Sequence, residues 1–553
     1  MKKSRIPLVL LVIISALIIT GCSTDTKGDA NNPDSTFPQL TEVTQNLKSY
    51  NLESSQENKF EVDFFEFDLG SKEYLSQAGR IMPYNIKGVI GVPKGEGPFP
   101  LILITHGSHS NDDESKRFDT GFDYLVKSLA ANGFITVSMD MSKPYIWKYG
   151  DNDDNEKLLP VADDHITSLK SAHAGNNPGY PLNLQGKINL DQVALIGHSR
   201  GGETIIDIAN DQVSKGIKIK SLLAIAPTFY FEREWPDAEI AILVPEYDGD
   251  LVGLDGFNLY RALNGAGQNF HSITLLMKGN HNYFNRNIER NDAIMAVGKD
   301  GIKDQLSRGE QEEFLTNFAV DFFNSSLLGK KESFLNPQTP QPNKMYGFDV
   351  KTMYKANSSV SLMDANSLAS LQGEGVQMER KIDSWFFKFD EVLIDTITTG
   401  GGPDEPDHPF LTKPLINIKW EEKGSKVSIS PLVTNFKDYN SLTLNLVIDS
   451  AADLNPQDKA QQFTIAVQDQ AGNSAKIILP ENLNALKPTP GELDSTPLLD
   501  TEIIFWSRPS PLASINIPLG ELSNLNLQEI ATIDLLFDQI DTGSIYLESI
   551  YLQ

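Results

Sequence analysis

The sequence contains a single cysteine, Cys22, and few positive charges. One cysteine excludes a disulfide within the chain and any metal site built from several thiolates. The 47 lysines and arginines are outnumbered by 74 aspartates and glutamates, which gives a formal net charge of −27. Such acidity favours solubility and argues against binding to nucleic acid, whose phosphates require basic partners.

Long apolar runs are also scarce, and the one near the N-terminus covers only residues 6–19. This run is shorter than the roughly 20 apolar residues that a membrane-spanning helix needs, and three basic residues precede it. The pattern predicts a signal peptide over residues 1–21, with an uncleaved anchor helix as the alternative.

The apolar run ends in residues 19–22, with the letters ITGC. These letters resemble the bacterial lipoprotein box, which implies cleavage before Cys22 and lipid attachment to its thiol. We therefore expect an extracytoplasmic lipoprotein that is anchored in a bacterial membrane through Cys22. Residues 22–45 are expected to form a flexible tether, because residues 23–38 are polar and have too little apolar content to fold.

Strands and helices alternate over residues 46–335, the expected catalytic domain. Short apolar or alternating runs predict strands, and apolar residues at helical spacing predict helices. This alternation predicts an α/β domain with a doubly wound, mostly parallel sheet. The expected strands are 60–69, 86–92, 101–105, 134–139, 193–196, 222–225, 240–244 and 273–277; the expected helices are 118–131, a segment after Ser199 reaching about residue 213, and 311–327.

The pattern changes after about residue 330. Residues 336–344 are rich in proline and polar residues and are expected to form a linker. Helical spacing nearly vanishes beyond them, and short alternating segments separated by turn residues predict an all-β sandwich over residues 345–553. The expected strands include 426–430, 441–448, 463–468, 514–518 and 544–552.

An apolar strand leads directly into Gly197-His198-Ser199-Arg200-Gly201. This is the G-x-S-x-G pattern of a nucleophile elbow in its strand-to-helix context. The turn is so sharp that side chains at the two glycines would collide with the neighbouring strand and helix. Ser199 is therefore the predicted nucleophile, held at the end of the sheet where the following helix N-terminus favours negative charge.

A serine nucleophile needs a general base, and the base needs a carboxylate to orient it. His281 follows the last predicted strand at its carboxyl end, where active sites of parallel sheets lie, whereas His271 begins that strand and is expected to be structural. The acid is expected in the loop after strand 240–244. Asp248 is the first choice, Asp250 is a rival and Glu246 a weaker one.

Two backbone N–H groups are expected to stabilise the oxyanion. One is that of Arg200, and the other is that of Ser108 in the loop after strand 101–105, where Gly107 allows a close approach to the site. The remaining histidines show no spacing typical of a metal site, so we expect neither a metal nor another cofactor.

These motifs, in this order, resemble the secreted α/β-hydrolases around dienelactone hydrolase, platelet-activating-factor acetylhydrolase and bacterial polyester hydrolases. The resemblance covers about residues 60–330 and implies a Ser-Asp-His triad on Ser199, Asp248 and His281, with esters as substrates. No aromatic residue follows Gly107, which argues against a flat aromatic polyester as the native substrate. The motifs are HG at 106–107, FDYLVKSLAANGFITVSMD at 122–140, GHSRGG at 197–202, PEYDGD at 245–250 and GNHNYF at 279–284.

The C-terminal segment 514–552 is similar to the last strands of jelly-roll modules in glycan-binding proteins, which implies a glycan as a possible ligand of residues 345–553. We expect that region to position the enzyme and to take no part in the chemistry. The favoured function is a serine esterase acting on a small-molecule, lipid or polymer ester. The alternatives are a serine peptidase of the same fold and a non-catalytic, glycan-binding surface lipoprotein.

Overall fold

The computed structural model describes residues 40–77, 79–150, 156–230, 234–266, 269–363, 368–383, 413–498 and 501–553. Cys22, the expected signal peptide and the first part of the expected tether lie outside these residues. Every helix in the described ranges is too short or too polar to cross a membrane. Residues Thr41–Gln553 group as one unit by their contacts.

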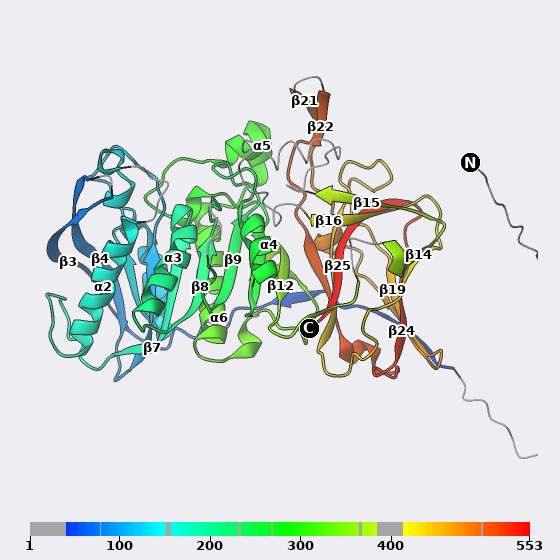
Figure 1. The fold of residues 1–553 in the computed structure, drawn as a ribbon, viewed down its shortest axis with the longest axis horizontal. Helices are drawn as coiled ribbons and strands as arrows, with labels where there is room; N and C mark the ends of the chain where they lie inside the picture. Colours follow the sequence, from blue (N-terminus) through cyan, green and yellow to red (C-terminus); the bar gives the residue numbers. More distant parts are fainter. Residues whose placement is uncertain are drawn as a thin grey trace, which may run out of the picture. The chain divides into compact units, whose positions relative to one another are not determined.

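An eleven-stranded mixed sheet organises the N-terminal part of this unit (Figure 1). The six strands from β10 to β6 run parallel to one another, as predicted for the centre of the sheet. Antiparallel pairs flank them on both sides, through β12 at one side and β4 and β3 at the other. In sheet order the strands are β2 (Tyr50–Leu52), β11 (Pro342–Met345), β12 (Phe348–Lys355), β10 (His271–Leu276), β9 (Glu239–Pro245), β8 (Ile219–Ile225), β7 (Ile188–His198), β5 (Phe99–Thr105), β6 (Ile135–Met139), β4 (Ile81–Pro93) and β3 (Val62–Leu75).

Helices cover both faces of this sheet because both faces of its central strands are apolar. Leu101 and Leu103 of β5 pack with α2 (Leu158–His173), α3 (Arg200–Ser214) and α4 (Gly256–Ala266). Ile102 and Ile104, which point the other way, pack with α1 (Asp123–Ala131) and α6 (Arg308–Ser326). The alternation along one strand therefore builds two separate hydrophobic layers, as expected for a doubly wound sheet.

Helix α2 is not among the helices that the sequence predicts, although Leu158, Ala162, Ile166 and Leu169 repeat at helical spacing and are buried. Helices α4 and α5 (Ala293–Gly301) are likewise additional. Short 3-10 helices occupy Asp119–Phe122, Lys143–Tyr145, Trp147–Tyr149, Asn282–Phe284, Ile302–Asp304, Lys331–Ser333, Leu368–Ser370, Asn484–Leu486 and Leu519–Leu522.

Two further sheets, each of six strands, form the C-terminal part and enclose one hydrophobic core. This is a β-sandwich arrangement, since strands of both sheets contribute to the same cluster. The first sheet has the order β1 (Glu42–Asn46), β20 (Ser474–Ile478), β19 (Thr464–Asp469), β24 (Ile530–Phe537), β17 (Ser425–Ile429), β14 (Leu371–Glu374). The second has the order β15 (Val376–Asp383), β16 (Lys413–Trp420), β25 (Gly543–Leu552), β18 (Ser441–Ile448), β23 (Ala513–Pro518), with β13 (Val360–Ser361) beside β25. Strands β21 (Leu493–Leu498) and β22 (Thr501–Trp506) form a separate hairpin.

Strand pairing divides the chain differently from the expected boundaries. Strand β12 lies beyond the boundary expected at residue 345, yet it pairs with β10 over the whole length of that strand. Strand β11 begins inside the expected linker 336–344, ends one residue beyond it and joins the same sheet. Strand β1, at the end of the expected tether 22–45, pairs with β20 of the C-terminal sandwich. The segment from β1 to β2 therefore contributes a strand to each of the two parts.

Candidate active site

Ser199 occupies the turn between β7, which ends at His198, and α3, which begins at Arg200. Its backbone has φ 57° and ψ −128°, a strained conformation for a residue with a side chain. The Ser199 N–H donates to the carbonyl of Ile225 at 2.9 Å, which ties the turn to β8. A Cβ atom on Gly197 would collide with the carbonyl of Gly201, so this turn requires glycine there.

Asp248 and His281 lie together in the loops that follow the carboxyl ends of β9 and β10, and His281 contacts the elbow through His198. Nδ1 of His281 donates to Oδ2 of Asp248 at 2.9 Å, and both side chains are 1% exposed. The other carboxylate oxygen of Asp248 accepts hydrogen bonds from the N–H groups of Asp250, at 3.1 Å, and Leu251, at 2.6 Å. The carboxylate of Asp248 is therefore fixed by its own loop on one side and by the imidazole of His281 on the other.

The electrostatic surroundings make the imidazole of His281 a strong base. Burial lowers the pKa of His281, but the adjacent carboxylate of Asp248 raises it by charge and by hydrogen bonding, and Asp250 and Asp292 add to this effect. The net result raises the pKa of His281 to about 9. The imidazole of His281 therefore has a high affinity for a proton, such as one taken from a nucleophile.

Asp250, the rival acid, lies elsewhere in the same loop. Its carboxylate is 3.6 Å from the guanidinium of Arg290, and its backbone N–H is what contacts Asp248. Of the two aspartates, Asp248 is the one whose carboxylate bonds to His281. The third candidate, Glu246, bonds instead to the N–H of Lys278 at 2.9 Å.

Asp292 organises the two loops and was not among the residues that the sequence singles out. It is fully buried, and its Oδ2 accepts hydrogen bonds from the N–H groups of His281, at 3.0 Å, and Gly249, at 2.8 Å. Its Oδ1 accepts one from Asn282 at 3.0 Å. Asp292 thus joins the loop after β10 that contains His281 (the base loop) to the loop after β9 that contains Asp248 (the acid loop). No sequence motif surrounds Asp292.

His198, inside the elbow, also contacts the base. Its Nε2 lies 3.0 Å from the carbonyl of His281, to which it donates, and the two imidazole rings are 4.9 Å apart. Burial holds the pKa of His198 well below its usual value, so the ring is neutral. The elbow therefore supports the base loop as well as the serine.

The loop after β5 lies directly against Ser199. A Cβ atom on Gly107 would lie 3.0 Å from Oγ of Ser199, so any side chain there would occupy the reacting centre. His106 holds this loop, because its Nδ1 donates to the carbonyl of Gly107 at 2.9 Å and its Nε2 accepts from the N–H of Met141 at 3.0 Å. The neighbouring Ser108 directs its hydroxyl to Asn111 at 2.8 Å.

Several exposed apolar side chains lie on segments along this same edge of the sheet. The end of the β3–β4 hairpin extends past the carboxyl end of β6 and meets the following loop, where Arg80 donates to the carbonyl of Lys148 at 3.1 Å. Tyr230 lies beside Arg200, with the guanidinium 5.3 Å from the ring, and Met295 packs against Gly249. The exposed apolar residues of these segments are Leu75, Ile81, Trp147, Tyr230, Val252, Ile294 and Met295.

His271 lies at the opposite end of β10 from the base. Its Nδ1 is 2.9 Å from the carbonyl of Asn269, its Nε2 is 2.8 Å from Oδ1 of Asn264, and burial lowers its pKa to about 4. Both ring nitrogens of His271 are thus engaged in hydrogen bonds with neighbouring residues. Across the described residues, no group of three or more His, Cys, Asp or Glu side chains is arranged to hold a metal ion.

Comparison with known proteins relates part of this chain to a hydrolase family. The family model described as Chlorophyllase matches residues 59–234. Chlorophyllase-2 of Arabidopsis thaliana is 24% identical over 183 residues, which are 32% of this chain and 52% of the relative. The chain thus spans about half the length of this curated relative.

The matched family is of the α/β-hydrolase type, in agreement with the fold of the eleven-stranded sheet. The match shows that the first part of the chain is similar to an ester-cleaving hydrolase family, chlorophyllase. The matched residues include Gly107 and Ser199 and end before Asp248 and His281. Asp248 and His281 therefore lie in the part of the chain that follows the matched segment.

Proposed function

We propose that this protein is a carboxylic ester hydrolase that forms an acyl-enzyme on Ser199. The observation that carries the proposal is the buried hydrogen bond between His281 and Asp248 beside a serine in a strained elbow. The similarity to chlorophyllase, an ester-cleaving hydrolase family, supports the same reaction class. A serine peptidase lacks such support, and a non-catalytic binder would have no use for a buried, oriented imidazole.

In the proposed reaction, Oγ of Ser199 attacks the ester carbonyl while His281 takes the hydroxyl proton. Asp248 stabilises the imidazolium that forms and keeps the imidazole in the orientation that leaves Nε2 for the serine. The imidazolium then donates its proton to the leaving alcohol. Water attacks the acyl-enzyme with His281 again as the base, which releases the acid and restores Ser199.

We assign the stabilisation of the developing oxyanion to the backbone N–H groups of Arg200 and Ser108, which would donate hydrogen bonds to it. Arg200 begins α3, whose N-terminus favours negative charge, and Gly107 keeps the loop close to the serine oxygen. Each such donor typically contributes about 3 kcal/mol to the stabilisation of the transition state.

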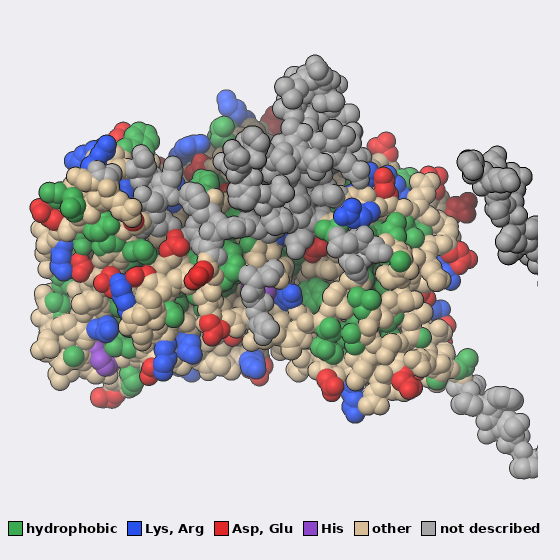
Figure 2. Space-filling model, in the orientation of Figure 1, with side chains coloured by type: hydrophobic (Ala, Val, Ile, Leu, Met, Phe, Trp, Pro, Cys, Tyr) green, Lys and Arg blue, Asp and Glu red, His purple; other side chains and the backbone are tan. Residues whose placement is uncertain are grey.

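The proposed substrate is a neutral ester with an apolar acyl or alcohol group. Exposed apolar side chains lie on the β3–β4 hairpin, on the loops after β6, β8 and β9 and on α5, at the same edge of the sheet as the candidate site; Trp147, Tyr230 and Met295 are among them. Exposed apolar surface of this kind marks binding sites more often than chance. On the face drawn in Figure 2, the described basic side chains are interspersed with acidic ones, which does not favour a nucleic-acid substrate.

The test is labelling with a fluorophosphonate followed by hydrolysis of a series of p-nitrophenyl esters. We expect stoichiometric labelling of Ser199, located by mass spectrometry, and faster turnover of esters with longer acyl chains. Peptide amides should be turned over much more slowly than esters. A protein that takes up no label and cleaves no ester would disprove the proposal, and selective cleavage of peptides would favour the peptidase alternative.

Two further proposals come from the sequence. The lipid on Cys22 would anchor the enzyme to a bacterial membrane, and the β-rich region after residue 345 would bind a glycan. Their supports are the lipoprotein-box letters at residues 19–22 and the similarity of residues 514–552 to jelly-roll modules.

A further inference from the structure

Glu246 connects the loop of the acid with two other parts of the chain. It stands two residues before Asp248, and its Oε2 accepts a hydrogen bond from the N–H of Lys278 at 2.9 Å. Its Oε1 accepts a hydrogen bond from Nη2 of Arg508 at 3.2 Å. Since Lys278 lies three residues before His281, one carboxylate joins the acid loop, the base loop and the C-terminal β-rich region.

The backbone around Glu246 continues the pairing of β9 and β10 past the ends of both strands. The N–H of Glu246 donates to the carbonyl of Leu276 at 2.9 Å, and that of Tyr247 donates to Gly279 at 2.7 Å. The guanidinium of Arg508 also lies over the ring of Tyr247, 5.0 Å from its centre. Arg508 therefore contacts two consecutive residues of the acid loop.

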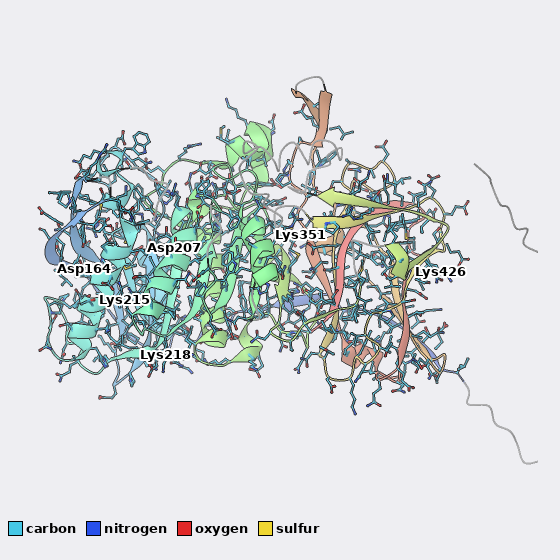
Figure 3. All side chains as sticks on the ribbon, viewed as in Figure 1. Asp164, Asp207, Lys215, Lys218, Lys351 and Lys426 are labelled. Atoms are coloured by element: carbon cyan, nitrogen blue, oxygen red, sulfur yellow. The ribbon has the colours of Figure 1, made fainter. Side chains whose placement is uncertain are left out.

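This contact region is poorly hydrated, so its charges interact strongly. The side chains of Glu246 and Arg508 are 12% and 17% exposed. Lys351 of β12, labelled in Figure 3, is buried nearby and donates from Nζ to the carbonyl of Lys487 at 3.3 Å. Burial lowers the pKa of Lys351 to about 8, while the charge of Glu246 opposes this shift. A loss of Arg508 would leave the Glu246 carboxylate buried with less compensation.

Arg508 is held by the region that carries it. It follows β22 and precedes β23, which pairs with β18 inside the sandwich. The indole N–H of Trp506 donates to the carbonyl of Thr489 at 3.0 Å, and the N–H of Ser507 donates to Glu492 at 2.9 Å. The guanidinium is thus presented from an anchored segment.

We propose that Arg508, acting through Glu246, positions the Asp248–His281 pair for the reaction at Ser199. The inference rests on the proposed ester hydrolysis and gives the C-terminal region a part in its rate. It replaces the expectation that residues 345–553 take no part in the chemistry. Glu246, the weaker candidate for the triad acid, becomes a positioning residue, and Arg508 becomes a second one.

A positioning role differs from a merely structural one in what it changes. A structural ion pair affects the free energy of unfolding and leaves turnover by the folded protein intact. A positioning pair affects kcat and the pH dependence of the reaction, because small displacements of a base relative to its nucleophile are costly. The binding of a small ester, and so KM, should change little in either case.

The experiment uses the full-length protein with four variants: Arg508→Met, Arg508→Lys, Glu246→Gln and the double variant Arg508→Met/Glu246→Gln. Lys426→Met is the control, because it removes an exposed ion pair with Glu374, 3.1 Å long, between β17 and β14, which belong to a different sheet from β9 and β10. For each variant, kcat and KM for a soluble ester are measured across pH, with thermal unfolding and circular dichroism to establish folding.

We expect Arg508→Met and Glu246→Gln each to lower kcat by about 10- to 100-fold, with KM nearly unchanged and the acid limb of the pH profile displaced. The double variant should be no worse than the poorer single variant, and Arg508→Lys should recover part of the rate. Lys426→Met should match the wild type. If Arg508→Met fails to fold, Glu246→Gln provides the same test. Its amide oxygen can still accept the hydrogen bond from the N–H of Lys278, so this variant keeps the contact between the two loops and loses the charge that pairs with Arg508.

Folded Arg508→Met or Glu246→Gln with wild-type kcat and pH profile would overturn this inference and leave the proposed function intact. A wild-type protein that neither labels at Ser199 nor cleaves an ester would overturn the proposed function, and this inference with it. A drop in kcat that equals the drop for Lys426→Met would also overturn it, because the effect would then be one of general stability.

Discussion

Nδ1 of His281 lies 2.9 Å from Oδ2 of Asp248, and both side chains are almost completely buried. The two residues come from the loops after adjacent parallel strands, β9 and β10. Hydrogen bonds within the protein, and not solvent, orient this pair. Asp292 accepts from the backbone N–H groups of His281 and Gly249, and the N–H of Leu251 donates to Asp248.

Ser199→Ala should abolish covalent labelling and lower ester turnover by a factor on the order of 10⁶, because the acyl-enzyme can no longer form. The substitution removes one oxygen at a site that is only 8% exposed, so the fold should remain. Labelling, turnover and circular dichroism on the purified variant check this. Activity close to that of the wild type would show that Ser199 is not the nucleophile.

Asp248→Asn should reduce turnover far more than Asp250→Asn. The amide can no longer stabilise the imidazolium or hold the same tautomer, and comparable changes lower kcat by about 10⁴-fold. Asp250 contributes only a more distant charge, since its carboxylate lies by Arg290. Steady-state kinetics on the two isosteric variants make the comparison, and the opposite ranking would assign the acid to Asp250.

The reaction should be suppressed by acid, with an apparent pKa above 6.5 and near that of His281, about 9. The base acts only when neutral, so kcat/KM should rise tenfold per pH unit below this value and level off above it. In Asp248→Asn, the charge that raises the pKa is lost and burial lowers it, so the imidazole should titrate at a lower pH. NMR titration of His281 in both proteins tests the direction, and an unchanged or higher pKa in the variant would contradict it.

Cys22→Ser should release the protein from the membrane fraction or leave its precursor unprocessed. A lipoprotein carries two or more acyl chains on its N-terminal cysteine, which suffices for stable anchoring, whereas a single chain binds only marginally. Cell fractionation and mass spectrometry of the mature N-terminus provide the measurement. An unmodified Cys22 in the mature wild-type protein would exclude the anchor.

A fragment of residues 48–335 should be poorly soluble, whereas 48–357 should be more soluble. The shorter fragment lacks β11 and β12, so it exposes the backbone edge of β10 and the apolar residues that Val350, Met353 and Tyr354 cover. The comparison of soluble yield and circular dichroism decides the matter. Equal folding of the two fragments would show that β12 is dispensable for the sheet.

Much of the sheet could be predicted because its central strands are short apolar runs bounded by turn residues. The expected strand 101–105 corresponds to β5, Phe99–Thr105, and the expected strand 240–244 to β9, Glu239–Pro245. Strands β1 and β12 were not predictable in the same way. Their partners, β20 and β10, are far away in the sequence, and the local pattern does not indicate which sheet a strand will join.

The sequence alone predicted the turn at Ser199, which the structure places between β7 and α3, and it supplied the proposed order of serine, acid and base, because strained turns and carboxyl-end loops leave local signatures in glycine and apolar spacing. It left Asp248 and Asp250 as rivals, since residues two apart in one loop share the same local signals. Only the tertiary structure distinguished them, by the direction in which each carboxylate points. The same holds for Asp292, His198 and the Glu246–Arg508 pair: their contacts join segments distant in the sequence, and long-range packing leaves no periodicity or motif in the chain.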